Sequence, residues 1–189
     1  MFITSFVHPA NLDHAGVNIK LRPCPHCRRV GMLIHHGYLW GRPGYGPKRT
    51  ERTRRARRFF CSNRRRRHGC GRTFSVYRAD VLPGSTLTTS VAWHFLSTVA
   101  TGISLEKAYL TLPSDVLFSW STLLRLWRSF RRHLPAIRSR LADSYRLQAV
   151  SPTDAPRETI LHLTRHLHDP PLNPIAVFQL RFQKPFLSP

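Results

Sequence analysis

Four cysteines are the residues of this 189-residue chain whose type and spacing point most directly to chemistry. Cys24 and Cys27 enclose two residues in RPCPHCRRVG, and this spacing lets two sulfurs face one metal ion. Cys61 and Cys70 enclose eight residues, SNRRRRHG, which must loop out if both sulfurs bind the same ion. Together the four cysteines predict one closed, tetrahedral structural metal site.

The cofactor that we expect at this site is one structural Zn²⁺ ion, because four thiolates form a common closed zinc site. A rubredoxin-like iron site has the same ligands and stays open as an alternative. The alternative without a metal is that the cysteines are ordinary buried core residues. Four histidines are candidates to replace a cysteine ligand, with His68 favoured among them: His26, His35, His36 and His68.

Short strands are expected to position the second cysteine pair. Residues 57–60, RRFF, lead into Cys61, and RTFSVY after Cys70 alternates in the manner of a strand. Each cysteine pair would then sit at a β hairpin. This arrangement predicts a zinc ribbon with basic insertions over residues 21–80, preceded by an N-terminal arm of residues 1–20.

A basic stretch runs through the predicted ribbon, since eleven of the twenty residues from 48 to 67 are Lys or Arg and one is acidic. The planar guanidinium fork of arginine suits bidentate contacts to phosphate and guanine. A solvated loop or a localisation signal is the alternative interpretation of this charge. The candidate nucleic-acid contacts are Lys48, Arg49, Arg52, Arg54, Arg55, Arg57, Arg58, Arg64, Arg65, Arg66, Arg67 and Arg72.

The composition also indicates a polyanionic partner. Thirty Lys+Arg against nine Asp+Glu give a formal charge of +21, which is sustained most easily beside nucleic acid. Hydrophobic residues make up 41% of the chain, which is enough for a folded core. No apolar run approaches the roughly 18 residues of a membrane span, and the N-terminus lacks a signal-peptide pattern. We therefore expect a cytoplasmic protein, nucleoid-associated if bacterial, without a membrane partner.

Helical spacing replaces alternation after Gly84. Ser85 or Thr86 is expected to cap a helix that carries apolar residues at four-residue intervals and ends at residues 101–102. A short helix over residues 104–110 follows, and a third helix begins near residues 119–122. The predicted fold class is small α+β: a four-cysteine zinc ribbon of short antiparallel β hairpins, an all-α helix-turn-helix domain over residues 84–148, and an extended proline-rich tail over residues 149–189.

The third predicted helix is amphipathic in charge as well as in hydrophobicity. A helix, a short helix after a glycine turn and a basic helix occur in the order of a helix-turn-helix, whose last helix enters the major groove. A helical bundle with merely solvated arginines is the alternative. The apolar stripe continues past Pro135 through Ile137, Leu141 and Tyr145, as either core or a homodimer seam. The candidate DNA-reading residues are Ser121, Thr122, Arg125, Arg128, Ser129 and Arg132.

The last 39 residues, 151–189, contain seven prolines and are expected to be extended, with residues 175–186 as a strand that pairs with a partner or folds back on the ribbon. His166-Leu167-His168 weakly matches the histidine pair of single-strand nicking enzymes. Acidic residues are scattered over the predicted modules, so no catalytic constellation is visible. We expect a protein that is not an enzyme.

The segments CPHC, RRFFCSNRRRRHGCGRTFSVY, LPGSTLTTSVAWHFL and GISLEKAY resemble the zinc-ribbon plus helix-turn-helix proteins associated with bacterial insertion-sequence transposases. The resemblance covers residues 20 to about 140. It implies that the four cysteines are the ribbon ligands and that the module binds DNA at the ends of a mobile genetic element, or works beside a transposase or recombinase during transposition and DNA recombination.

These observations predict a non-catalytic, zinc-containing protein that binds double-stranded DNA in preference to RNA, as an accessory or regulator of a mobile element. The alternative from a different class is an RNA-binding component of a ribonucleoprotein. Exposed base-stacking aromatics at Tyr38, Trp40 and Tyr45 would favour that alternative. A nuclease that uses His166 and His168 is the third hypothesis.

Overall fold

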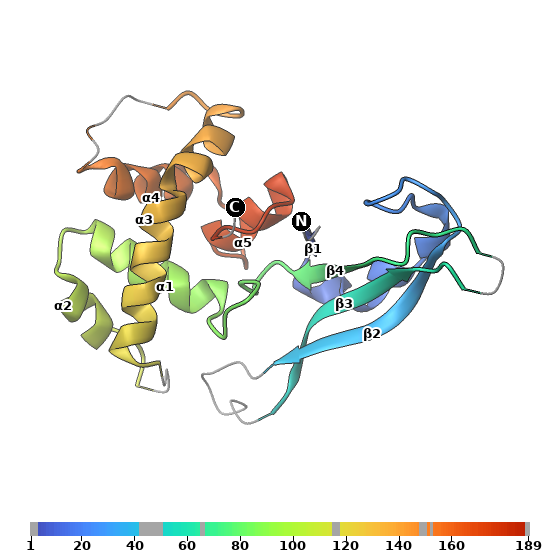
Figure 1. The fold of residues 1–189 in the computed structure, drawn as a ribbon. Helices are drawn as coiled ribbons and strands as arrows, with labels where there is room; N and C mark the ends of the chain where they lie inside the picture. The colour runs from blue at the N-terminus through green and yellow to red at the C-terminus, as the bar shows by residue number, and fades with distance from the viewer. Residues whose placement is uncertain are drawn as a thin grey trace.

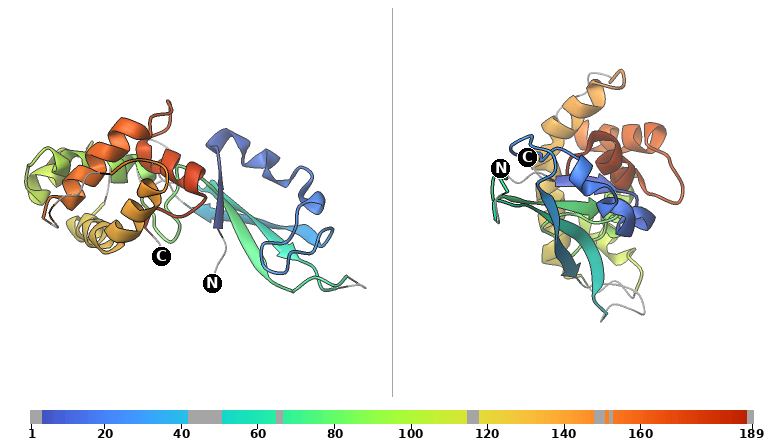
Figure 2. Two further views of the ribbon diagram at one scale, coloured as in Figure 1. Left: turned by 90° about the horizontal axis from the view of Figure 1, so that it is seen from above. Right: turned by 90° about the vertical axis from the view of Figure 1, so that its right-hand side faces the viewer.

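The structure, a computed structural model, describes residues 4–41, 51–64, 67–114, 118–147, 151 and 153–187. Within these ranges a four-stranded sheet and five α-helices form two parts that lie at opposite ends of the molecule (Figures 1 and 2). The prediction of a small α+β fold, with strands first and helices second, is confirmed at this level.

The sheet has the strand order β1-β4-β3-β2. Strands β2, β3 and β4 are antiparallel neighbours, whereas β1 pairs with β4 in parallel. The predicted N-terminal arm is therefore wrong, because its first described residues form a sheet strand and three short 3-10 helices follow them. The bounds are β1 Thr4–Val7, β2 Leu33–Gly41, β3 Thr53–Cys61 and β4 Thr73–Arg78, with 3-10 helices η1 Pro9–Asn11, η2 Asp13–Gly16 and η3 Ile19–Leu21.

A small apolar core holds the sheet part together. Phe59 of β3 is fully buried and stacks on Phe74 of β4 with ring centroids 5.4 Å apart. Leu33, Val76 and two of the cysteines, Cys24 and Cys61, complete this core. Two of the four sulfur atoms therefore belong to the apolar cluster, and strand alternation points that of Cys61 inward from β3.

The helices are α1 Thr89–Ala100, α2 Leu105–Leu110, α3 Trp120–Ala142, α4 Ala155–His166 and α5 Pro174–Phe182. Thr88 caps α1, because its hydroxyl accepts from the N–H of Val91, so the predicted cap at residue 85 or 86 was two or three residues early. The short helix predicted over residues 104–110 is present as α2, and Ser104 is its cap, because its hydroxyl accepts from the N–H of Lys107. Pro135 lies inside α3 and does not end it.

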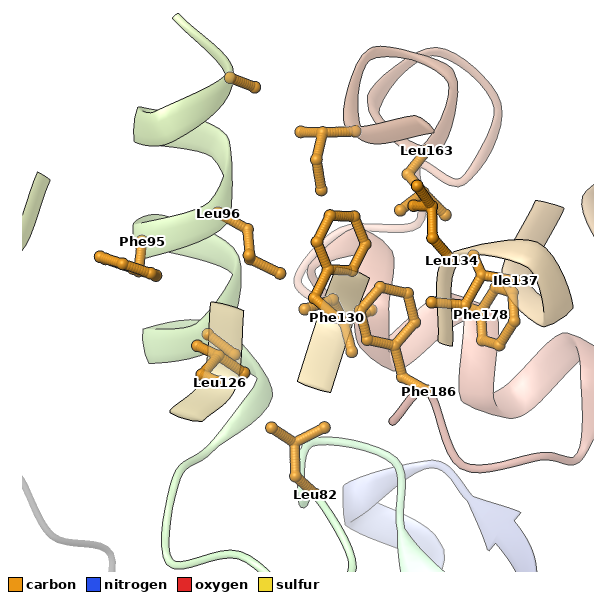
Figure 3. Close-up of a cluster of buried hydrophobic side chains, with 14 of the residues drawn as sticks. Leu82, Phe95, Leu96, Leu126, Phe130, Leu134, Ile137, Leu163, Phe178 and Phe186 are labelled. Carbon is orange, nitrogen blue, oxygen red and sulfur yellow. The ribbon is translucent and has the colours of Figure 1, made fainter. Parts of the chain in front are cut away.

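The core of the helical part is built around α3. Phe130 lies between Leu96 of α1 and Phe186 near the C-terminus, and its ring stacks on Phe186 at 5.9 Å (Figure 3). Ile137 and Leu141 are fully buried in the same cluster. The apolar stripe beyond Pro135 is therefore core of this chain and not a homodimer seam.

The predicted extended tail is wrong, because residues 155–166 form α4 and residues 174–182 form α5. Pro156 and Pro174 lie in the first turns of these helices, where a missing N–H costs nothing and the fixed φ suits the helix. Phe178 is fully buried, and the side-chain amide of Gln179 donates to the carbonyls of Ala79 (2.7 Å) and Val81 (3.0 Å). The tail thus completes the helical core and ties it to the chain that leaves the sheet.

Candidate metal centre and nucleic-acid interface

The four cysteine sulfurs lie within 4.8 Å of one another at one end of the sheet. The Cys24 and Cys70 sulfurs are 3.8 Å apart, and the Cys27 and Cys61 sulfurs are 3.7 Å apart. Four thiolates around an ion at about 2.3 Å form a tetrahedron whose edges are about 3.8 Å. The predicted grouping is confirmed: these four side chains could hold one metal ion.

The first cysteine pair is held by a tight turn. The N–H of Arg28 donates to the carbonyl of Cys24 at 2.8 Å, and the N–H of Cys24 donates to the carbonyl of Arg29 at 2.9 Å. The N–H of His26 also points at the Cys24 sulfur, at 3.4 Å. Arg28 has a positive φ of 62°, an unusual conformation for a residue with a β-carbon.

The second cysteine pair repeats this backbone pattern in spite of its longer spacer. The N–H of Gly71 donates to the carbonyl of Cys61 at 2.9 Å, and the N–H of Cys61 donates to the carbonyl of Arg72 at 2.9 Å. The N–H of Cys70 points at the Cys61 sulfur, at 3.3 Å. Gly71 has a φ of 70° and so occupies the position that Arg28 occupies in the first turn.

The additional residues of the second pair leave the turn between Ser62 and Gly69. The N–H of Gly69 donates to the carbonyl of Ser62 at 2.9 Å, which closes the base of the insertion. A β-carbon on Gly69 would lie only 2.3 Å from that carbonyl oxygen, so the close approach requires glycine. The predicted loop-out of the arginine-bearing segment therefore begins and ends at these two residues.

Burial and backbone hydrogen bonds set the acidity of the thiols. Burial raises the pKa of Cys61 to about 12 and also raises the pKa of Cys24. A hydrogen bond from the backbone of Arg29 lowers the pKa of Cys27 to about 7. An ion that binds here must displace protons from the buried thiols, as four-thiolate sites generally require.

Histidine ligands are not needed to complete this group. The cluster of potential metal ligands found among the described residues consists of cysteines alone. The ring of His26 faces the carbonyl of Thr73 at 3.3 Å, the ring of His35 packs against Phe59, and His68 is exposed. His36 likewise packs against an aromatic ring, that of Phe60.

Three arginines of β3 are bound to their own chain. Arg54 forms an ion pair with Asp13 at 2.8 Å, and Arg57 donates to the backbone carbonyl of Asp13 at 2.6 Å. Arg55 is half-buried and donates to the carbonyl of Leu82 at 3.3 Å, and burial lowers its pKa. These three predicted phosphate contacts therefore have internal roles that the sequence did not indicate.

The remaining predicted basic contacts are of two kinds: those within the described residues and those outside them. Within the described residues the ion pairs are Arg54–Asp13 and Arg78–Asp80, so the other predicted arginines there have no carboxylate partner. These are Arg52, Arg58, Arg64, Arg67 and Arg72 in the sheet part and Arg125, Arg128 and Arg132 on α3. Lys48, Arg49, Arg65 and Arg66 lie outside the described residues.

On α3 the predicted DNA-reading arginines lie away from the core. Arg125, Arg128 and Arg132 are exposed, whereas Leu123 and Phe130 on the other face are fully buried. The guanidinium group of Arg125 donates to the carbonyl of Ser121, one turn earlier, at 3.3 Å. At the start of the helix, the hydroxyl of Ser119 forms hydrogen bonds with the hydroxyls of Ser121 and Thr122.

The insertion lies far from α3. It follows Cys61, the last residue of β3, at the end of the sheet that points away from the helices, whereas α3 crosses the helical part (Figure 1). Any single nucleic-acid ligand that contacts both the insertion and α3 must therefore extend along the whole molecule.

Two other features singled out in the sequence are the histidine pair of the nuclease hypothesis and the aromatic residues of the RNA hypothesis. The ring of His166 lies 4.3 Å from His162 and 4.7 Å from Tyr145, but His168 is exposed, and no group of potential metal ligands in the described part includes either His166 or His168. Trp40 is 49% exposed, as a base-stacking residue must be, while Tyr38 lies under the guanidinium group of Arg54 at 4.6 Å. Tyr45 is outside the described residues.

Within the described residues, no helix has both the length and the hydropathy that crossing a bilayer requires. No protein-family model, no curated protein and no solved structure matches this chain. Its function must therefore be inferred from the chain's own residues.

Proposed function

We propose that this protein is a zinc-stabilised, non-catalytic DNA-binding protein that acts as an accessory or regulator of a mobile genetic element. The observation that carries the proposal is the division of α3 into a fully buried apolar face and a solvent-facing side with three arginines. In a chain with a formal charge of +21, such a face is suited to the phosphates and base edges of a duplex.

The zinc ion would be held by the four cysteines and would supply folding energy to the sheet part. Binding of zinc to such sites contributes on the order of 10 kcal/mol. The apolar core of this part is small, with Phe59, Phe74 and Leu33 among its few large members, so it depends on the ion for stability. In this proposal the sheet with its cysteine turns is a zinc ribbon.

The helices α1, α2 and α3 would form the helix-turn-helix. Gly102, with a φ of 97°, makes the turn between α1 and α2, and the hydroxyl cluster at Ser121 opens α3. The N-terminal turns of α3 would contact base edges, while Arg128 and Arg132 further along would contact phosphates. The arginines of the insertion would add contacts to the backbone at the other end of the molecule.

The test is binding of the full chain, by fluorescence anisotropy, to duplex DNA, single-stranded DNA and a structured RNA of equal length across a salt series. We expect the chain to prefer the duplex. Removal of the metal should abolish the contribution that the arginines of the insertion make to binding. The double substitution Arg128→Gln with Arg132→Gln should weaken duplex binding by about tenfold or more and lower the salt slope by about two. The matched control removes two exposed positive charges elsewhere: Arg157→Gln with Lys184→Gln.

The half-exposed Trp40 favours one competing function, RNA binding by the sheet part. Tighter binding to RNA than to duplex DNA at every salt concentration, with no effect of the α3 substitutions, would overturn the DNA proposal. In that case Trp40→Ala should weaken RNA binding, because a stacked base contributes about 1–3 kcal/mol.

A further inference from the structure

A small basic cavity lies between the C-terminal half of α3 and the helix α4. Its volume is about 80 Å³, and a cavity that holds one water molecule needs about 10–15 Å³, so a group of several heavy atoms fits. Apart from His166, which the nuclease hypothesis named, none of the residues that line it belongs to the predicted metal or nucleic-acid sites. The lining residues are Arg138, Arg146, Leu147, Glu158, Leu161, His162, Arg165 and His166.

The charge of this cavity is strongly positive. Three arginines, Arg138, Arg146 and Arg165, line it together with one acidic residue, Glu158. Arg138 is held in place, because it donates to the hydroxyl of the fully buried Thr159 at 3.2 Å. Like charges gathered in one cavity repel each other unless an anion binds between them.

A histidine in the wall has a buried ring nitrogen without a partner. The Nε2 atom of His162 is inaccessible to solvent and has no hydrogen-bond partner among the described residues. Its ring is fixed by packing against His166 at 4.3 Å and Tyr145 at 5.5 Å. A buried polar atom without a partner costs free energy, so a ligand that offers it a hydrogen bond is favoured once the exposed His166 ring beside it moves aside.

We propose that this cavity is a binding site for a phosphate group. The oxygens of phosphate accept from the planar forks of arginine and from a ring N–H of histidine, and the tetrahedral group suits the small volume. This site is independent of the proposed DNA-binding face of α3. The phosphate belongs either to a small phosphorylated molecule or to a nucleic-acid backbone, and duplex binding by cavity variants separates these sources.

The test follows the histidine ring signals of the full chain by NMR while inorganic phosphate is added at constant ionic strength, with chloride as the comparison anion. We expect saturable shifts of the His162 and His166 signals with phosphate and not with chloride. The substitutions Arg146→Gln and Arg165→Gln affect exposed side chains and should together weaken phosphate binding by about tenfold or more. Arg157→Gln, an exposed arginine of the same helix outside the cavity lining, should leave it unchanged.

The source of the phosphate follows from duplex binding by the same variants. If Arg146→Gln with Arg165→Gln also weakens duplex binding and lowers its salt slope, the site takes a backbone phosphate. If duplex binding is unchanged while phosphate binding is lost, the site takes a small phosphorylated molecule. Absence of saturable shifts at His162 and His166, or equal shifts with chloride, would overturn the inference even if α3 binds DNA as proposed.

Discussion

The backbone N–H of Gly69 donates to the carbonyl of Ser62 at 2.9 Å, and this one bond brings the ends of the arginine-bearing insertion together. The eight-residue spacer between Cys61 and Cys70 therefore acts, at its base, like the two-residue spacer between Cys24 and Cys27. The metal centre and the basic insertion are thus separable parts of one turn.

Deletion of residues 63–68, which leaves Cys61-Ser62-Gly69-Cys70, is expected to preserve the metal centre. The shortened turn keeps the bonds of Gly71 to Cys61 and of Cys61 to Arg72, so zinc content and the circular dichroism spectrum should match those of the intact chain. Nucleic-acid affinity should fall, and the salt slope should decrease by about 0.9 for each phosphate that the shortened chain no longer neutralises. Loss of zinc on deletion would show that the insertion itself is needed for the turn.

The substitution Arg28→Gly is expected to stabilise the protein, by up to about 1 kcal/mol, because Arg28 has a φ of 62° that glycine adopts without strain. Thermal unfolding of the zinc-loaded protein measures the effect. Gly71 occupies the equivalent place at φ 70°, so Gly71→Ala should have the opposite sign. Equal effects of the two substitutions would contradict the equivalence of the two turns.

Gln179→Leu is expected to destabilise the protein by about 2–4 kcal/mol. The fully buried amide donates to the carbonyls of Ala79 and Val81 and accepts from the N–H of Phe186 at 3.2 Å, so leucine leaves three buried backbone groups without partners. Urea unfolding gives the free energy. The exposed neighbour Lys184 supplies the control, since Lys184→Ala should change stability by less than about 0.5 kcal/mol.

His162 is expected to make the protein less stable in acid. Burial, followed by the nearby charges of His166, Arg165 and Arg138, lowers its pKa below the ordinary value of 6.5. The unfolded chain therefore takes up a proton at a higher pH than the folded chain does, and stability is lost as pH falls below about 6.5. His162→Phe should remove this part of the pH dependence in phosphate-free urea unfolding, whereas replacement of the exposed His168 by Gln should not. Identical pH profiles of His162→Phe and the parent chain would contradict the lowered pKa.

The sequence determined the local features. Cysteine spacing, the short helix after Gly102 and the apolar period of α3 are short-range patterns, and the structure contains the cysteine cluster and these helices at the predicted places. The two helices of the tail also had a local signal, since Asp154 and Asn173 stand just before helices that begin with proline in the first turn. The number of prolines in the tail instead led to the prediction of an extended segment.

Only the tertiary structure decided which basic residues are available to a ligand. Arg54, Arg55 and Arg57 look like their neighbours in the sequence, but Asp13 and Leu82, which bind them, are at least 27 residues away along the chain. The parallel pairing of β1 with β4 and the cavity between α3 and α4 likewise join distant segments. Such contacts form only when segments that are far apart along the chain pack together in the two cores. A pattern of neighbouring residues therefore does not predict them.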